Sequence, residues 1–252
     1  MVFNSCLLPI KTYKISAVSY TNTKPFVFGI YQTNLITTID LSLDIPSLCA
    51  EKVLSDKVDI GLVPVATLLG NMNLLTIISC YGICATGVVN SVFLLSNKPV
   101  QHIHTVRLDT HSQTSNLLLK VLLKYFWKLS VEFVDNEINE VDASVLIGDR
   151  TFGETKNYEF VYDLSQIWQE FTQLPFVFAV WVANKYIEQS FVEQFNRALS
   201  VGISNIASVI KEHEKTVDDF DIADYLVNKI QYHISEKHEE GMQLFLKLAS
   251  TL

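Results

Sequence analysis

The chain has 252 residues, a hydrophobic fraction of 49% and a formal net charge of −8 at pH 7. This length allows one large core or two smaller lobes, and an acidic chain without a basic stripe argues against nucleic acid as a partner. No apolar run reaches the roughly 18 residues that a membrane span needs, so a membrane partner is not expected either.

The chain start and the cysteines predict a cytoplasmic protein. Residues 1–11 lack the basic leading region of a secretory signal, and a proline interrupts their short apolar stretch. Beyond residues 1–11, three cysteines lack metal-ligand spacing and are expected to be buried, reduced thiols: Cys49, Cys80 and Cys84.

Short β-rich runs alternate with helical patterns through most of the chain. Strands are expected at residues 14–18, 38–43, 59–63, 75–80, 91–96, 105–109, 131–134, 143–147 and 160–162. Helices are expected between them, most clearly at 46–55 and 114–127. Such alternation is typical of α/β proteins with parallel sheets and helices on both faces.

Two long apolar strands, at 91–99 and 175–181, divide the chain. After Asn184, a candidate N-cap, the apolar spacing is helical, with further helices at 218–233 and 236–250 and no strand after Trp181. The sequence thus predicts two lobes joined by a two-strand hinge, with a helical C-terminal tail. Residues 1–95 and 181–252 would form the first lobe and 96–180 the second, with a ligand cleft between them.

The first polar cluster, Ser19 to Pro25, follows the strand at 14–18 and leads into a helix. Free N–H groups and the positive end of the helix dipole favour an anion there. Asn22 can donate and accept hydrogen bonds, while Ser19 adds a hydroxyl and Lys24 a positive charge. The alternative is a capped βα turn.

Three other clusters lie at the ends of expected elements. Ser91 stands at the first crossing strand, either as a ligand-facing hydroxyl or as an ordinary strand start. The hydroxyls of residues 110–115 lead into the long helix and can cap it or hold a carboxylate. Asp149, after the strand at 143–147, is a candidate general acid or base or part of a surface turn with Arg150.

Common cofactor and hydrolase motifs are missing from the sequence. No Walker, GxGxxG, GxSxG or HExxH motif occurs. His102 and His104 have metal-like spacing without a clustered partner, so a solvated strand start is the better interpretation. The missing motifs remove the common nucleotide-binding, hydrolase and zinc-protease interpretations, and no metal site is expected at these histidines.

Together these clusters resemble the menaquinone-pathway family whose founding activity is chorismate dehydratase, in the futalosine route. The resemblance spans roughly residues 14 to 184 and rests on segments in a fixed order: AVSYTNTKP at 17–25, DIGLVPV at 59–65, SVFLLS at 91–96, Asp109-Thr110-x-Ser112-x-Thr114-Ser115, LIGD at 146–149, Asp163-Leu164 through Trp168, and LPFVFAVW at 174–181.

The resemblance implies a type II periplasmic-binding-protein-like fold, used as an enzyme that removes water from chorismate, a small dicarboxylate, to give 3-[(1-carboxyvinyl)oxy]benzoate. It implies Asn22 and Ser91 as the principal catalytic residues, and no cofactor. Asp149 is a candidate proton acceptor, with the substrate's enolpyruvyl carboxylate as the alternative. The candidate substrate-binding residues are Ser19, Lys24, Thr110, Thr114, Ser115, Gly148 and Phe176.

Three positions depart from the family pattern. Thr21 stands where leucine is usual, Asn90 where arginine is frequent, and His111 where serine is usual. Because Asn90 is neutral, one carboxylate contact is either missing or supplied by Lys24. Two alternatives remain: 1,4-dihydroxy-6-naphthoate synthase, which usually has histidine where Gly148 follows its strand, and a non-catalytic protein that binds or senses a small anion. The oligomeric state is not predicted.

Overall fold

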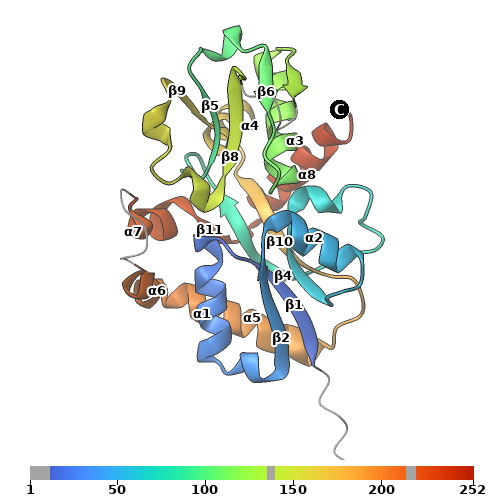
Figure 1. Cartoon of the computed structure of the whole chain (residues 1–252). Coiled ribbons are helices and arrows are strands. Elements are labelled where there is room, and N and C mark those ends of the chain that lie inside the picture. The colour runs from blue at the N-terminus through green and yellow to red at the C-terminus, as the bar shows by residue number, and fades with distance from the viewer. Residues whose placement is uncertain (1–11, 135–139, 214–219) are drawn as a thin grey trace, which may run out of the picture.

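The computed structural model describes residues 12–134, 140–213 and 220–252. The predictions for the segment 1–11 and for the beginning of the helix expected at 218–233 lie outside these residues. The described chain forms two sheets, one above the other in Figure 1, with helices around both.

The first sheet has six strands in the order β11-β4-β10-β3-β1-β2. Their bounds are β1 Tyr13–Val18, β2 Ile39–Asp44, β3 Ile60–Pro64, β4 Thr76–Ala85, β10 Phe176–Ala183 and β11 Gln231–His233. β1 pairs in parallel with β2 and β3, whereas β10 runs antiparallel to β3 and β4. The near-continuous burial of β1, β3 and the end of β4 explains why these segments are apolar runs.

The second sheet has five strands in the order β7-β6-β8-β5-β9. Their bounds are β5 Val92–Ser96, β6 Thr105–Arg107, β7 Glu132–Val134, β8 Ala143–Ile147 and β9 Phe160–Asp163. β6 is parallel to β7 and β8, but β5 is antiparallel to both β8 and β9. The expectation of parallel sheets is therefore only partly met. Both sheets are mixed because the chain enters the second sheet through β5 and returns to the first through β10.

Eight α-helices accompany the described strands. Their bounds are α1 Lys24–Gln32, α2 Pro46–Leu54, α3 Gln113–Val121, α4 Leu164–Thr172, α5 Gln189–Ser204, α6 Ile206–His213, α7 Ile222–Asp224 and α8 Glu236–Ala249. Two π-helical turns continue from helices, Leu122–Trp127 after α3 and Tyr225–Lys229 after α7.

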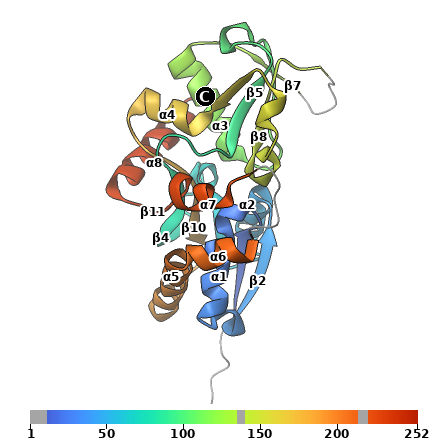
Figure 2. The same ribbon diagram turned by 90° about the vertical axis from the view of Figure 1, so that its left-hand side faces the viewer.

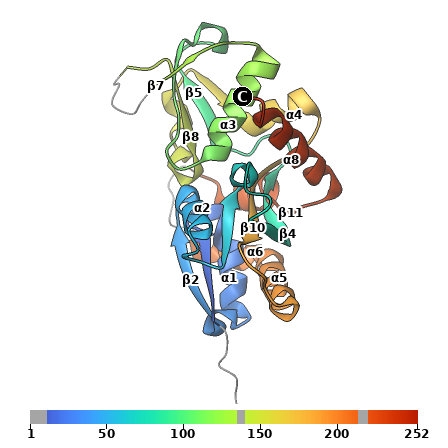
Figure 3. The ribbon, with the colours of Figure 1, turned by 90° about the vertical axis from the view of Figure 1, so that its right-hand side faces the viewer.

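The first sheet is covered on both faces, with α2 and α5 on either side of it in Figure 3. The Trp181 ring on β10 lies 5.9 Å from that of Phe26 on α1 and 5.0 Å from that of Phe195 on α5, measured between centroids. In Figure 2, α6 crosses in front of α1. Aromatic side chains from sequence-distant helices therefore close the core over β10.

The last helix, α8, packs against both parts of the molecule. It contacts α3 and β10, and its Phe245 ring lies 5.0 Å from that of Phe176 and 6.2 Å from that of Trp168 on α4. The tail thus reaches beyond the first lobe, on which it was expected to pack.

The chain changes sheets between Ala85 and Val92 and again between Asp163 and Phe176. Asp163 holds the first of these connections in place. Its carboxylate accepts hydrogen bonds from the backbone N–H groups of Val89 and Asn90 at 2.9 and 2.8 Å, and from two N–H groups in the first turn of α4. The division into lobes at residues 95 and 181 stays a prediction.

Three local predictions are wrong. A strand does follow Trp181, because β11 pairs with β4. Asn184 does not cap α5, whose N-cap is Glu188; its amide instead donates to the carbonyls of Val53 and Val58. Cys80 is exposed and lies between Ile77 and Gly82, where the register of β4 against β10 shifts; Cys49 and Cys84 are buried as expected.

Candidate functional site

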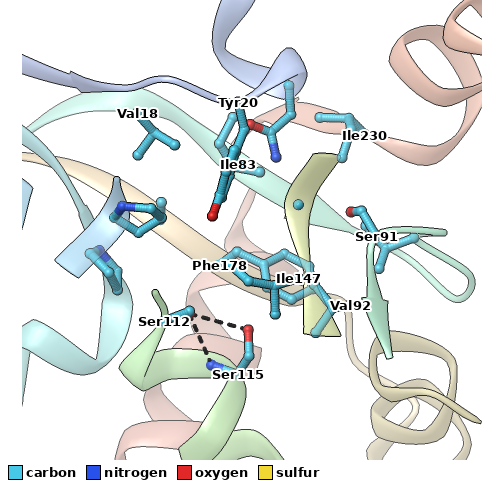
Figure 4. A pocket seen from close by; sticks show the side chains of 16 residues that line it. Val18, Tyr20, Ile83, Ser91, Val92, Ser112, Ser115, Ile147, Phe178 and Ile230 are labelled. Atoms are coloured by element: carbon cyan, nitrogen blue, oxygen red, sulfur yellow. Dashed lines mark hydrogen bonds between the residues drawn. The ribbon is translucent and has the colours of Figure 1, made fainter. Parts of the chain in front are cut away.

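A pocket with a cavity volume of about 50 Å³ lies between the two sheets. Its walls come from the ends of β1, β3 and β8, from β4 and β10, and from the beginnings of β5 and α3. Figure 4 shows the apolar side chains of Val18, Ile83, Ile147 and Phe178 around it, with polar groups at opposite sides. The pocket is therefore largely apolar with a few placed hydrogen-bonding groups, the usual design of a ligand site.

One side of the pocket, which we call the amide end, consists of Asn22, Ser91 and Tyr225. Asn22 and Ser91 line the pocket. The buried Tyr225 hydroxyl donates to Ser91 Oγ at 2.9 Å and accepts from Asn22 Nδ2 at 3.3 Å. Two predicted residues from distant segments are thus joined through a third that the sequence did not single out.

The other side, which we call the helix end, consists of Ser112 and Ser115 at the beginning of α3. Ser112 is the N-cap: its Oγ accepts from the backbone N–H of Ser115 at 3.3 Å and lies 3.2 Å from Ser115 Oγ. The first turn of a helix carries N–H groups without partners in the helix, together with the positive end of its dipole. This end of the pocket suits a carboxylate.

The third wall is the ring of Tyr20, which packs on Gly148. Gly148 has a φ of +63°, and a Cβ atom there would lie 2.6 Å from the Tyr20 ring. Only glycine fits both the backbone conformation and this contact. The Tyr20 hydroxyl lies 2.7 Å from Nδ1 of His111. Burial and the charge of Arg150 lower the pKa of His111, so its ring is neutral near pH 7.

Asp149 joins the two parts of the molecule rather than lining the pocket. Its carboxylate accepts from the backbone N–H of Thr21 at 3.0 and 3.1 Å and from Thr21 Oγ1 at 3.0 Å. Burial raises the pKa of Asp149, against the opposing effect of these bonds and of Lys24. Asp149 and Arg150 do lie in a turn, the 3-10 segment Gly148–Thr151, in which Arg150 is exposed and pairs with the buried Asp109 at 2.6 Å.

Two further bonds hold the sheets close around the pocket. The backbone N–H of Ser47 donates to the carbonyl of His111 at 3.1 Å, and the N–H of Ala66 donates to Thr114 Oγ1 at 3.0 Å. Together with the bonds from Thr21 to Asp149, these two bonds connect the two sides of the cleft. The structure therefore shows the cleft closed.

The structure brings together some of the predicted site residues and separates others. Asn22, Ser91, Ser115 and Gly148 line the pocket, and Thr114 spans the cleft beside it. Ser19, Lys24, Thr110 and Phe176 do not line it.

Each of these four has another environment. Ser19 and Lys24 border a surface hollow next to His213, and burial lowers the pKa of Lys24. Thr110 is exposed. Phe176 packs among aromatic rings, 5.4 Å from Trp168 between centroids. Their roles in binding stay predictions.

Three polar side chains in or directly behind the pocket lining were missed: Tyr20 and Ser112, which line it, and Tyr225, which bonds to Ser91. Tyr20 lay inside a quoted segment, and Ser112 preceded a helix as an N-cap, so local signals existed for both. Tyr225 lies in the C-terminal tail, where its helical setting gave no sign of a ligand.

The described residues hold no cluster of three or more histidine, cysteine, aspartate or glutamate side chains placed to bind a metal ion. Among the helices described here, none is long and apolar enough to cross a membrane.

Comparison with known proteins places this pocket in context. A family model described as menaquinone biosynthesis matches residues 13–251. The chorismate dehydratase of Thermus thermophilus is 27% identical, over 80% of this chain and 83% of that protein. The chorismate dehydratase of Campylobacter jejuni is 30% identical, over 68% of this chain and 67% of that protein.

Solved structures agree on the fold. A protein from Archaeoglobus fulgidus superimposes with a TM-score of 0.73 at 14% identity, covering 96% of this chain and 97% of that one. A Candida albicans protein described as having the generic periplasmic binding protein fold gives 0.67 at 11% identity, covering 97% and 91%. The predicted two-lobed, periplasmic-binding-protein-like fold is confirmed.

Proposed function

The chain belongs to the menaquinone biosynthesis family, and from this premise we propose that it is a chorismate dehydratase, converting chorismate to 3-[(1-carboxyvinyl)oxy]benzoate and water. Two curated relatives with that name support the proposal. The observation that carries it furthest is the amide end, where Asn22 and Ser91 meet at one pocket through Tyr225.

The reaction sets clear demands on a site. It removes one ring hydrogen and the neighbouring hydroxyl group, and aromatisation supplies the driving force. The enzyme must hold two carboxylates, stabilise the charge that develops as these bonds break, and exclude water. The apolar walls of the pocket meet the last demand.

The helix end would hold the ring carboxylate. Ser112 and Ser115 supply hydroxyls there, and α3 supplies backbone N–H groups and its dipole. The expected cation, Lys24, lies at the neighbouring surface hollow, so this anchoring would rest on neutral donors.

The amide end would act on the bonds that break. The Ser91 hydroxyl would donate a hydrogen bond to the departing hydroxyl group, which leaves as water by taking up the proton removed from the ring carbon. Asn22 has a second amide hydrogen for the substrate, because one is directed to Tyr225. Removing a donor of this kind costs a few kcal/mol of barrier in comparable sites.

The environment of Asp149 favours the substrate's own enolpyruvyl carboxylate as the proton acceptor. Both carboxylate oxygens of Asp149 are engaged by Thr21, and the residue is not part of the pocket lining. Asp149 would then serve closure of the cleft, with the proton moving within the substrate.

The direct test is to incubate the purified protein with chorismate and to follow the benzoate product by chromatography and mass spectrometry. The proposal expects an aromatic product that has lost one water, formed without added metal or cofactor. Tight binding of chorismate without turnover would contradict it and favour an anion sensor. Turnover of a cyclic futalosine derivative instead would favour the naphthoate synthase.

A further inference from the structure

We propose that Tyr225 is a positioning residue for the dehydration: its hydroxyl holds Ser91 so that the serine proton points into the pocket. This inference rests on the proposed function and deepens it, because it assigns a role to a residue outside the sequence motifs on which the family resemblance rests.

The direction of the hydrogen bonds follows from what each group can do. The amide nitrogen of Asn22 can only donate, so the oxygen of Tyr225 accepts there, at 3.3 Å. The single phenol proton is then directed to Ser91 Oγ, at 2.9 Å. Ser91 Oγ accepts this phenol proton, so the proton of Ser91 itself is free to be donated to another group. Because Ser91 lines the pocket, that group can be a ligand in the pocket.

The amide of Asn22 is itself oriented by a neighbour. Thr23 Oγ1 donates to Asn22 Oδ1 at 3.3 Å, which leaves the nitrogen to face Tyr225. The chain of donors therefore runs in one direction, from Thr23 through Asn22 and Tyr225 to Ser91. A ligand group that accepts from Ser91 would complete it.

The surroundings of Tyr225 suit a donor rather than a base. The residue is 1% exposed, and burial raises the pKa of its phenol well above the ordinary value. The phenol stays protonated at neutral pH, so no proton leaves it during turnover. Its contribution is a fixed hydrogen bond that also makes Ser91 a better donor.

The local fold holds this side chain firmly. Tyr225 begins the π-helical turn that follows α7, and such turns are rare and concentrate at functional sites. Its ring packs against those of Phe152 and Phe220, at 5.7 and 5.2 Å between centroids. A hydroxyl on a ring held this way can orient a partner at little entropic cost.

Tyr232 offers a matched control. It is a second buried tyrosine in the same region of the tail, 5% exposed, and its hydroxyl has no hydrogen-bond partner among the residues that the structure describes. Tyr232→Phe and Tyr225→Phe both remove one buried phenol oxygen. Only Tyr225→Phe removes a contact with Ser91.

The experiment measures kcat and KM for chorismate in the full chain for wild type, Tyr225→Phe, Tyr232→Phe, Ser91→Ala and the double variant Tyr225→Phe/Ser91→Ala. Tyr225→Phe is expected to lower kcat about tenfold or more, with KM within about threefold of wild type. Tyr232→Phe is expected to match wild type. In the Ser91→Ala background, Tyr225→Phe is expected to have no further effect, because its partner is already missing.

The outcomes separate the two claims. If wild type forms no benzoate product, the proposed function fails and the inference fails with it. If wild type is active and Tyr225→Phe has the kcat of Tyr232→Phe, the inference alone is wrong. A further loss of kcat from Tyr225→Phe in the Ser91→Ala background also overturns it, because Tyr225 would then act through another group.

Discussion

The two ends of the pocket are built in opposite ways. At the amide end, Asn22 and Ser91 come from distant segments and are tied by Tyr225 from the tail. At the helix end, Ser112 and Ser115 come from one turn and bond to each other. One end depends on the tertiary fold for its geometry, whereas the other is formed locally by the start of a helix.

This difference suggests a division of labour. Groups that must meet a changing charge need fixed positions, because a preorganised donor avoids reorganisation during the reaction. A helix N-terminus attracts a carboxylate in substrate and product alike, so it contributes binding that is equal in the ground and transition states. We expect substitutions at the amide end to lower kcat and those at the helix end to raise KM.

The largest effect is expected from Ser91→Ala. Loss of the donor should lower kcat about 10²- to 10³-fold, with KM changing little. Steady-state kinetics with chorismate, together with a thermal melt to establish folding, make this measurement. A variant that keeps most of its kcat while KM rises would show that the amide end merely binds.

The support behind the amide end can be tested through pH. Burial raises the pKa of Asp163, which fixes the connection just before Ser91, to about 6. The unfolded value is about 3.9, so the folded state binds the proton more tightly. This contribution to stability is fully present below about pH 4 and is lost as pH rises through about 6, amounting to at most about 3 kcal/mol.

Chemical unfolding of wild type and Asp163→Asn across this pH window measures the effect. The variant is expected to be less stable even above about pH 6, where the wild-type carboxylate accepts four N–H groups and the amide of the variant cannot. The difference in unfolding free energy between the two proteins should shrink as pH rises through about 6. A difference that does not change with pH would show that Asp163 titrates normally.

At the helix end, Ser112→Ala with Ser115→Ala should raise KM about tenfold and leave kcat within about threefold. The hydroxyls are lost, but the backbone N–H groups and the dipole of α3 remain. The same kinetic assay gives both constants. A loss confined to kcat would reverse the assignment of the two ends.

The smallest effect is expected from Asp149→Asn. An asparagine keeps one acceptor for Thr21, so closure of the cleft should weaken only partly, and KM should rise a few-fold while kcat is nearly kept. If Asp149 is instead the proton acceptor, kcat falls by several orders of magnitude in the same assay. The kcat of this variant therefore decides whether Asp149 or the substrate's enolpyruvyl carboxylate accepts the proton.

The sequence predicted most elements because apolar periodicity is a local property. It failed where distant pairing decides the outcome. β5 and β10 turn the sheets from parallel to mixed, and the three-residue strand β11 exists only because β4 offers an edge. Asn184 shows the same limit. Its residue type predicted a helix N-cap, but its amide donates instead to the carbonyls of Val53 and Val58, which are far away in the sequence.

The same distinction holds at the site. Asn22, Ser91 and Ser115 lay in contiguous segments and do line the pocket. Lys24 was in such a segment, but it begins α1 and borders a different hollow. Tyr225 could be found only from the structure, because no local sequence pattern around it predicts a contact with Ser91.

The most direct measurement is a crystal structure of the protein with the benzoate product bound. The account predicts the ring carboxylate within hydrogen-bond distance of Ser112, Ser115 and the N–H groups of α3, with Ser91 and Asn22 facing the ring carbon that carried the hydroxyl. A ligand with its ring carboxylate at Ser91, or one bound outside this pocket, would contradict it.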